Sequence, residues 1–299
     1  MFLQSPVNTS NKLNQFFRRC FFIEITIMPI LKILPSNQQY FSMGSKMNKT
    51  VIEWCDFTWN PVTGCKHPCR DVYCYNTKKS TSPLNRFGAK YRENGKVVSE
   101  KDWKSRETGE NHVALQGEVY PYGYDPTIYF YRLDQPKKVK EPAKIFVADT
   151  GDLFGNWVPA EWVSSVLSVV KECPWHTFQF LTKNPRKLLA YDFPENAWVG
   201  TSINSDRDVE RVNILKKVKA PVRYLSVEPL LGELTFNLTG IEWVILGAMT
   251  GKNPVVPEIA WIEGVLTSAG KNNIPVFMKD NVERYYQSAE GLPKEFPVL

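Results

Sequence analysis

From Lys144 onward, short apolar runs alternate with longer windows of helical periodicity. Such runs, bounded by polar or turn-forming residues, are typical of strands buried on both faces of a parallel sheet. The predicted strands span 144–148, 177–181, 197–201, 222–227, 242–247 and 274–278. The predicted helices span 160–172, 206–218 and 258–269, and each presents one apolar face. This alternation predicts an α/β fold built from strand–helix repeats.

The strand that leads into Cys65 brings the total to about seven parallel strands. Repetition of this kind favours a parallel (β/α) barrel or part-barrel of about six to eight strands. No Gly-x-Gly-x-x-Gly sequence opens a helix, so an open sheet that binds a dinucleotide is the weaker alternative.

The chain of 299 residues, 43% of them apolar, is long enough for a sizeable core. We expect residues 47–299 to form one α/β domain, with an irregular, polar insertion at about 77–141. Residues 1–46 are interpreted as an extension, disordered or added by an upstream start, in preference to a targeting segment. The apolar run within that extension, 20–34, is broken by polar residues and too short to span a bilayer. We therefore expect a cytoplasmic protein with no membrane partner.

The net charge of +6 is unevenly distributed. Residues 1–46 hold five Lys or Arg against one Glu, so the remainder of the chain is nearly neutral. A surface that binds nucleic acid through phosphates needs a basic excess on the folded domain. Charge therefore gives no indication of nucleic acid as a partner.

Half of the six cysteines, Cys65, Cys69 and Cys74, fall within one short segment that follows the turn-forming sequence WNPVTG. Three neighbouring thiols cannot all pair as disulfides, so they are interpreted as metal ligands, for zinc or for an iron–sulfur cluster. His67 lies between the first two and is expected to be solvent-exposed, with a Cys3His zinc site as the alternative. Cys55 and Cys173 are expected in the core.

Polar residues follow nearly every predicted strand, where the site of a parallel α/β fold forms. The candidates are Asp149, Asp152, Lys183, Ser202, Asn204, Glu228, Lys279 and Asp280. Asp152 is equally well explained as a cap of the next turn. Lys183 could be a solvated residue, but its place directly after an apolar strand favours a pocket. An acid and two lysines on one rim suit an amino acid-like group or an anionic substrate.

Several segments together resemble a family, the phage-associated, uncharacterised radical-SAM-like proteins. They are IEW-x-D-x-TWNPVTGC, the cysteine cluster ending in Cys-Tyr, IFVADTGDLFG, FQFLTKNP, WVGTSIN, RYLSVEPLLG and WVILGAMTGK. The resemblance runs in order from about Ile52 to Lys279. The usual radical-SAM spacing is Cys-x3-Cys-x2-Cys, and the second gap of this chain is two residues longer.

The resemblance implies a barrel of the radical S-adenosylmethionine (AdoMet) type. In such enzymes three cysteines hold a [4Fe-4S] cluster, and the fourth iron binds the amino and carboxylate groups of AdoMet. Reductive cleavage then yields a 5′-deoxyadenosyl radical that abstracts hydrogen from a substrate. Tyr73, just before the last cysteine, matches the aromatic residue that commonly packs near the adenine. An electron donor is the further partner implied.

The first hypothesis is accordingly an iron–sulfur enzyme that uses AdoMet on an unknown substrate, with Cys65, Cys69 and Cys74 as ligands. Cofactor and substrate would contact Asp149, Asp152, Lys183, Ser202, Asn204 and Glu228. The second hypothesis is a noncatalytic zinc or iron–sulfur module that binds a protein or nucleic acid through the basic residues Lys101, Lys104 and Arg106. Polar residues at so many strand ends favour the enzyme, because a scaffold does not need them.

Overall fold

The structure is a computed structural model that describes residues 46–71, 73–74, 92–93, 96–97, 108–118, 120–251, 253–289 and 291–298. The expected extension, apart from Lys46, lies outside the described residues, and so does most of the first half of the expected insertion, including Lys101, Lys104 and Arg106. The described residues all belong to one compact unit, residues 43–299.

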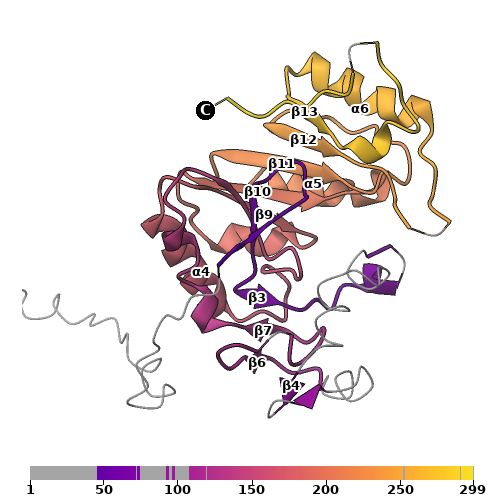
Figure 1. Cartoon of the computed structure of the whole chain (residues 1–299). Coiled ribbons are helices and arrows are strands. Elements are labelled where there is room, and N and C mark those ends of the chain that lie inside the picture. Colours follow the sequence, from indigo (N-terminus) through magenta and orange to yellow (C-terminus); the bar gives the residue numbers. More distant parts are fainter. Residues whose placement is uncertain are drawn as a thin grey trace, which may run out of the picture. The chain divides into compact units, whose positions relative to one another are not determined.

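One eight-stranded sheet organises this unit, in the order β1-β2-β8-β9-β10-β11-β12-β13 (Figure 1). Its strands are β1 (Asn48–Lys49), β2 (Phe57–Trp59), β8 (Lys144–Val147), β9 (Thr177–Thr182), β10 (Ala197–Ser202), β11 (Val222–Val227), β12 (Trp243–Leu246) and β13 (Val276–Met278). Only β1 runs antiparallel to its neighbour. Within the described residues the edge strands β1 and β13 do not pair, so the sheet is a part-barrel. The predicted α/β class and the seven parallel strands are confirmed.

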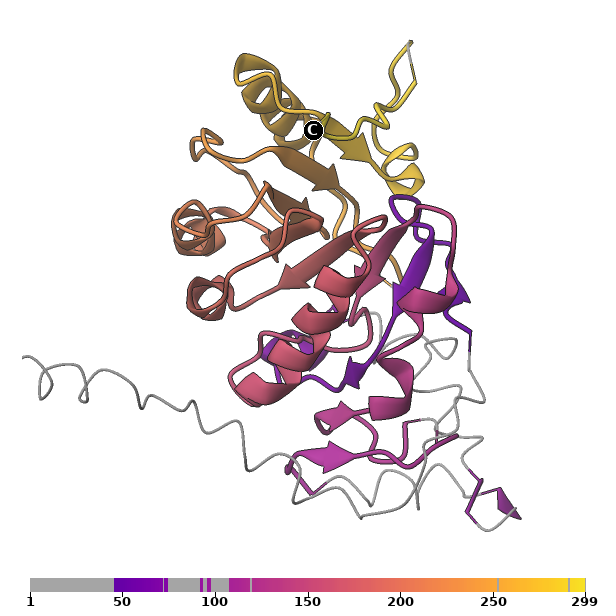
Figure 2. The ribbon, with the colours of Figure 1, turned by 90° about the vertical axis from the view of Figure 1, so that its left-hand side faces the viewer.

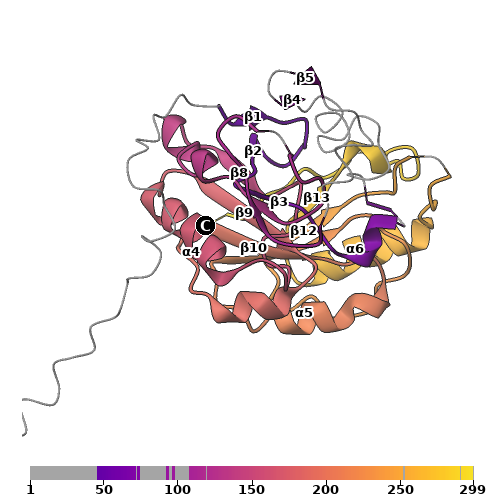
Figure 3. The same cartoon turned by 90° about the horizontal axis from the view of Figure 1, so that it is seen from below.

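Helices follow the strands as the periodicity predicts. They are α4 (Ala160–Glu172), α5 (Val209–Leu215) and α6 (Ile259–Lys271), with the 3-10 helices η3 (Pro68–Asp71), η4 (Phe130–Arg132), η5 (Pro136–Lys138), η6 (Pro185–Ala190), η7 (Asp206–Asp208) and η8 (Asp280–Val282). Seen from below, α4, α5 and α6 lie along the same face of the sheet (Figure 3). The buried face of α4 includes Trp162, Val163 and Val166, because residues three and four apart share one side of a helix.

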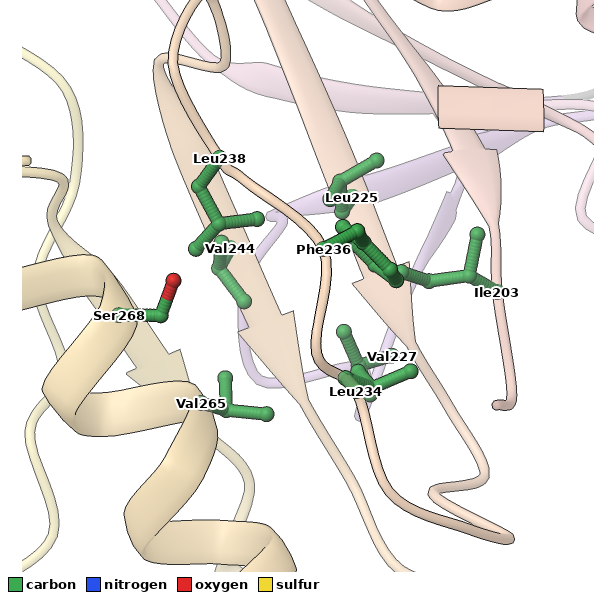
Figure 4. Close-up of a pocket in the computed structure, with 9 residues that line it drawn as sticks. All are labelled: Ile203, Leu225, Val227, Leu234, Phe236, Leu238, Val244, Val265 and Ser268. Carbon is green, nitrogen blue, oxygen red and sulfur yellow. The ribbon is translucent and has the colours of Figure 1, made fainter. Parts of the chain in front are cut away.

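Alternation along each strand sends neighbouring residues to opposite faces. In β11, Leu225 and Val227 join the core under the helices, whereas Tyr224 joins a second cluster on the inner face. An apolar cavity of about 10 Å³ lies between Leu225 and Val265 of α6. Figure 4 shows the side chains that line it. This space is about that of a single water, so the outer core is closely packed.

The inner face is aromatic near the beginning of the strands. Trp243 lies with its ring centroid 5.6 Å from that of Trp198 and 5.4 Å from that of Tyr224. Residues on the same face but nearer the carboxyl ends, Ser202 and Ser226, instead line a cavity. The curved sheet is thus filled at one end and hollow at the other, and Figure 2 shows the succession of its strands by their colours.

A second sheet joins the residues just before the cysteine segment to the expected insertion. Its order is β3-β7-β6, with β3 (Val62–Thr63), β6 (His112–Val113) and β7 (Thr127–Ile128), and a separate hairpin pairs β4 (Arg92–Glu93) with β5 (Lys96–Val97). Ile128 and Tyr129 are fully buried. The described part of the insertion therefore contributes side chains to the core.

Gly64 lies where the two sheets meet, with φ of 91° and a bridge to Gly151. A Cβ atom here would lie 2.3 Å from the Asp125 carbonyl oxygen. We expect Gly64→Ala to lower the free energy of unfolding of the metal-free protein by about 2–5 kcal/mol, because a left-handed backbone and overpacking both act on it. Urea denaturation measures the change.

Gly264→Ala is the matched control, because Gly264 is helical and has nothing within 4 Å of an added Cβ. That substitution should stabilise the protein by about 0.5–1 kcal/mol. Equal effects of the two substitutions would contradict the close approach at Gly64.

Candidate functional site

A cavity of about 790 Å³ lies at the carboxyl ends of the parallel strands. Its lining comes from the β1–β2 segment, the cysteine segment, the tyrosines Tyr120 and Tyr124, and residues at or just after the carboxyl ends of β8, β9, β10, β11, β12 and β13. Ligand cavities of proteins usually measure about 300–1,000 Å³. The space therefore suits a cofactor together with a small substrate.

The three cysteines of the 65–74 segment all line this cavity. The backbone N–H of Cys65 donates to the Tyr124 carbonyl at 3.0 Å, which fixes the start of the segment. The N–H groups of Tyr73 and Cys74 both donate to the Cys69 carbonyl, at 3.2 and 3.1 Å. These two hydrogen bonds form a turn between the second and third cysteines.

Asn60 ties the residues before the cysteine segment to the end of β8. Its Oδ1 accepts hydrogen bonds from the backbone N–H and the hydroxyl of Thr150, at 3.2 and 3.0 Å, and its Nδ2 donates to Asp149. Asn60 and Thr150 are buried. The amide therefore aligns the entry to the cysteine segment with the rim of the sheet.

His67 does not face solvent, which corrects the sequence-based expectation. Its Nε2 lies 2.6 Å from Asp152 Oδ2, and its side chain is 16% exposed. Its ring packs edge-on against Trp157, with 4.9 Å between centroids. The local sequence indicated exposure because the carboxylate partner is 85 residues away along the chain.

Asp152 is buried and accepts four hydrogen bonds. Besides the bond with His67, Oδ2 accepts hydrogen bonds from the Thr182 hydroxyl and the Lys183 N–H, each at 3.0 Å. Oδ1 accepts a hydrogen bond from the Phe154 N–H at 3.0 Å. A carboxylate offers about four lone-pair positions. Donors within the protein thus occupy the acceptor positions of the Asp152 carboxylate. The assignment of Asp152 as a cofactor residue stays a prediction.

Tyr73 is fixed by the end of β10. Its hydroxyl donates to Asn204 Oδ1 at 2.7 Å, and Asn204 Nδ2 donates to the Pro229 carbonyl at 2.7 Å. The Lys183 ammonium lies 5.6 Å from the centroid of the Tyr73 ring. Burial raises the pKa of the Tyr73 hydroxyl, so it remains a neutral donor.

Glu228 and Lys279 form an ion pair across the cavity rim, through Glu228 Oε1 and Lys279 Nζ. Gly247 makes room for it, because a Cβ there would lie 3.0 Å from Glu228 Cγ and Cδ. Asp280 does not join this pair. Its carboxylate accepts a hydrogen bond from the Lys294 ammonium at 2.6 Å, and its side chain is 73% exposed. Of these three rim residues, only Glu228 and Lys279 line the cavity.

Two of the three thiols, Cys65 and Cys69, have a raised pKa in the metal-free protein. Burial raises the pKa of Cys65 to about 12, although the His67 backbone N–H opposes it. Burial also raises the pKa of Cys69, and the Lys183 ammonium opposes that shift. Because thiolates bind metals, metal uptake at these cysteines must release protons.

The structure brings the predicted site residues together at this cavity. Its lining includes Cys65, Cys69, Cys74, Tyr73, Asp149, Asp152, Lys183, Ser202 and Glu228, whereas Asn204 acts through Tyr73. Within the described residues, no group of three or more His, Cys, Asp or Glu side chains converges closely enough to hold a metal ion. Sequence reasoning missed Asn60, whose position before a proline in a turn was the available signal.

Fold and site together define an α/β part-barrel protein with a three-cysteine segment over a polar cavity. The chain belongs to the family described as "Protein of unknown function (DUF5131)", whose profile matches residues 49–291. Comparison with curated proteins found no match. None of the helices in the described ranges has the length and apolar character needed to cross a membrane.

Among solved structures, the chain is similar to spore photoproduct lyase complexed with dinucleoside spore photoproduct, at 13% identity and a TM-score of 0.42. That alignment covers 77% of this chain and 65% of the lyase chain. A mutant of the lyase with bound AdoMet and dinucleoside spore photoproduct matches at 12% identity, covering 77% and 65%, with a TM-score of 0.42. The chain thus spans just under two thirds of these lyase chains.

Proposed function

We propose that this protein is an iron–sulfur enzyme of the radical AdoMet type, acting on a substrate bound in the 790 Å³ cavity. The observation that carries the proposal is the position of Cys65, Cys69 and Cys74, which share one cavity with the strand-end groups. The donor set fits a [4Fe-4S] cluster, since three thiolates leave one iron open for a further ligand. When bound and reduced, the cluster would supply the electron that cleaves AdoMet into a hydrogen-abstracting radical.

The residues around the thiols suit the two ends of an amino acid group. Glu228 offers a carboxylate for an ammonium, while Lys183 offers an ammonium for a carboxylate. In the described part of the chain Lys183 has no carboxylate within ion-pair distance, and its ammonium lies 5.6 Å from the centroid of the Tyr73 ring. We infer that AdoMet occupies the space between them, next to Tyr73 and Ser202.

The rest of the cavity is the proposed substrate space. Tyr120 and Tyr124 line it, as do Asn48 and Lys49. Aromatic and amide side chains orient an organic substrate, and the surrounding walls limit the access of water to a reactive species. An electron donor and a cytoplasmic location complete the proposal, and the phage association implied by the sequence resemblance remains part of it.

Anaerobic reconstitution with iron and sulfide tests the proposal. We expect a brown protein with about four iron and four sulfide atoms per chain, the content of a [4Fe-4S] cluster. A colourless protein that retains one zinc per chain after the same treatment would contradict the proposal and support the noncatalytic zinc module instead.

A further inference from the structure

The His67–Asp152 pair links the cysteine segment to the strand ends. His67 is two residues from both Cys65 and Cys69, and its Nε2 lies 2.6 Å from Asp152 Oδ2. Asp152 is 4% exposed, follows β8, and is itself held by Thr182 and the Lys183 N–H at the end of β9. The ring therefore connects the loop between two thiols to a rigid point in the sheet.

Two peptide bonds separate His67 from Cys65, and two more separate it from Cys69. Fixing the ring thus restricts the backbone that carries both sulfurs. The Trp157 ring packs against another side of the His67 ring, with 4.9 Å between the two ring centroids. Displacement of the imidazole would consequently release the loop that contains both Cys65 and Cys69.

We propose that His67 is a positioning residue for the metal centre and not one of its ligands. Through Asp152 it holds the Cys65–Cys69 loop in the arrangement that takes up metal, and the three cysteines alone supply the protein ligands. This inference rests on the proposed function for the identity of the metal centre, but it concerns only the residues of this chain. The rival role is a fourth ligand, because metal-bound histidines commonly donate their second ring nitrogen to a carboxylate.

Two substitutions separate positioning from ligation. In His67→Gln the amide nitrogen stands as many bonds from Cα as Nε2 does, so it can still donate to Asp152, but it lacks an imidazole to bind metal. In His67→Ala both capacities are lost. His176→Ala is the control, because His176 is buried before β9, at the strand end opposite Thr182 and Lys183.

The measurements are the half-life of the reconstituted cluster in excess chelator without oxygen, and the ¹⁴N coupling seen by pulsed electron paramagnetic resonance after reduction. We expect His67→Ala to lose its cluster about 10- to 100-fold faster, the usual effect of removing a group that supports metal ligands. His67→Gln and His176→Ala should stay within about threefold of the unsubstituted protein. We expect no histidine-type ¹⁴N coupling in the unsubstituted protein.

Thermal unfolding of the metal-free variants shows whether His67→Ala speeds cluster loss only by lowering the stability of the folded protein. Cluster loss as fast in His67→Gln as in His67→Ala, or a histidine ¹⁴N coupling that His67→Gln removes, would overturn the positioning role. So would a His67→Ala cluster as durable as the original. If the unsubstituted protein retains only zinc, the proposed function fails, and the same comparison of half-lives for zinc decides the role of His67.

Discussion

Replacement of both Cys69 and Cys74 with Ala is expected to abolish cluster assembly, lowering the iron content from about four atoms per chain to nearly zero. A single remaining thiolate, Cys65, cannot hold a cluster that needs three protein ligands. The loss should occur without unfolding, because the side chains of Cys69 and Cys74 are only partly buried. Iron and sulfide analysis after anaerobic reconstitution measures the effect, with circular dichroism to check the fold.

Cys173→Ala is the matched control for this experiment. Cys173 is a fully buried thiol that follows α4 and belongs to the core under the helices. Its replacement should lower stability by roughly 1 kcal/mol, as expected for a small buried side chain, and leave the iron content unchanged. Retention of a full cluster in the protein without Cys69 and Cys74 would exclude these cysteines as ligands.

Replacement of Glu228 with Ala is expected to weaken binding of AdoMet to the reconstituted protein by about 10- to 100-fold. A hydrogen bond to a charged group contributes about 1.5–3 kcal/mol, and about 1.4 kcal/mol corresponds to a factor of ten in affinity. The carboxylate lies at the cavity rim beside Lys279, where Gly247 leaves room for it. Isothermal titration of AdoMet into the reconstituted protein and its Glu228→Ala variant measures the change.

Glu242→Ala serves as the comparison, because Glu242 also forms an ion pair at a strand terminus but does not line the cavity. It precedes β12 and contacts Arg223 at 2.6 Å, at the beginning of the sheet and not at its carboxyl end. This variant should bind AdoMet as the original protein does. Equal affinity in the Glu228 and Glu242 variants would show that Glu228 is not a cofactor residue.

Much of the fold could be predicted because each strand is an apolar run in a buried sheet. The run 144–148 becomes β8, and the window 160–172 becomes α4 with the same bounds. Local pattern is sufficient in such cases, since burial on both faces requires continuous apolar sequence. The same reasoning placed the polar strand ends on one rim, where Glu228 and Lys279 indeed meet.

The connections within the site could not be predicted, because they join residues far apart in sequence. Asn60 contacts Thr150 and His67 contacts Asp152, at separations of 90 and 85 residues. Single-sequence patterns report local periodicity and turn chemistry, not which buried donor meets which acceptor. The expectation that His67 is exposed was wrong for this reason.

Formation of 5′-deoxyadenosine tests the central proposal most directly. The reconstituted protein would be reduced without oxygen in the presence of AdoMet, and the products separated by liquid chromatography and identified by mass. We expect 5′-deoxyadenosine and methionine to accumulate with the original chain and not with the variant that lacks Cys69 and Cys74. A reconstituted, reduced cluster that leaves AdoMet intact, or a protein that holds only zinc, would contradict the proposed radical chemistry.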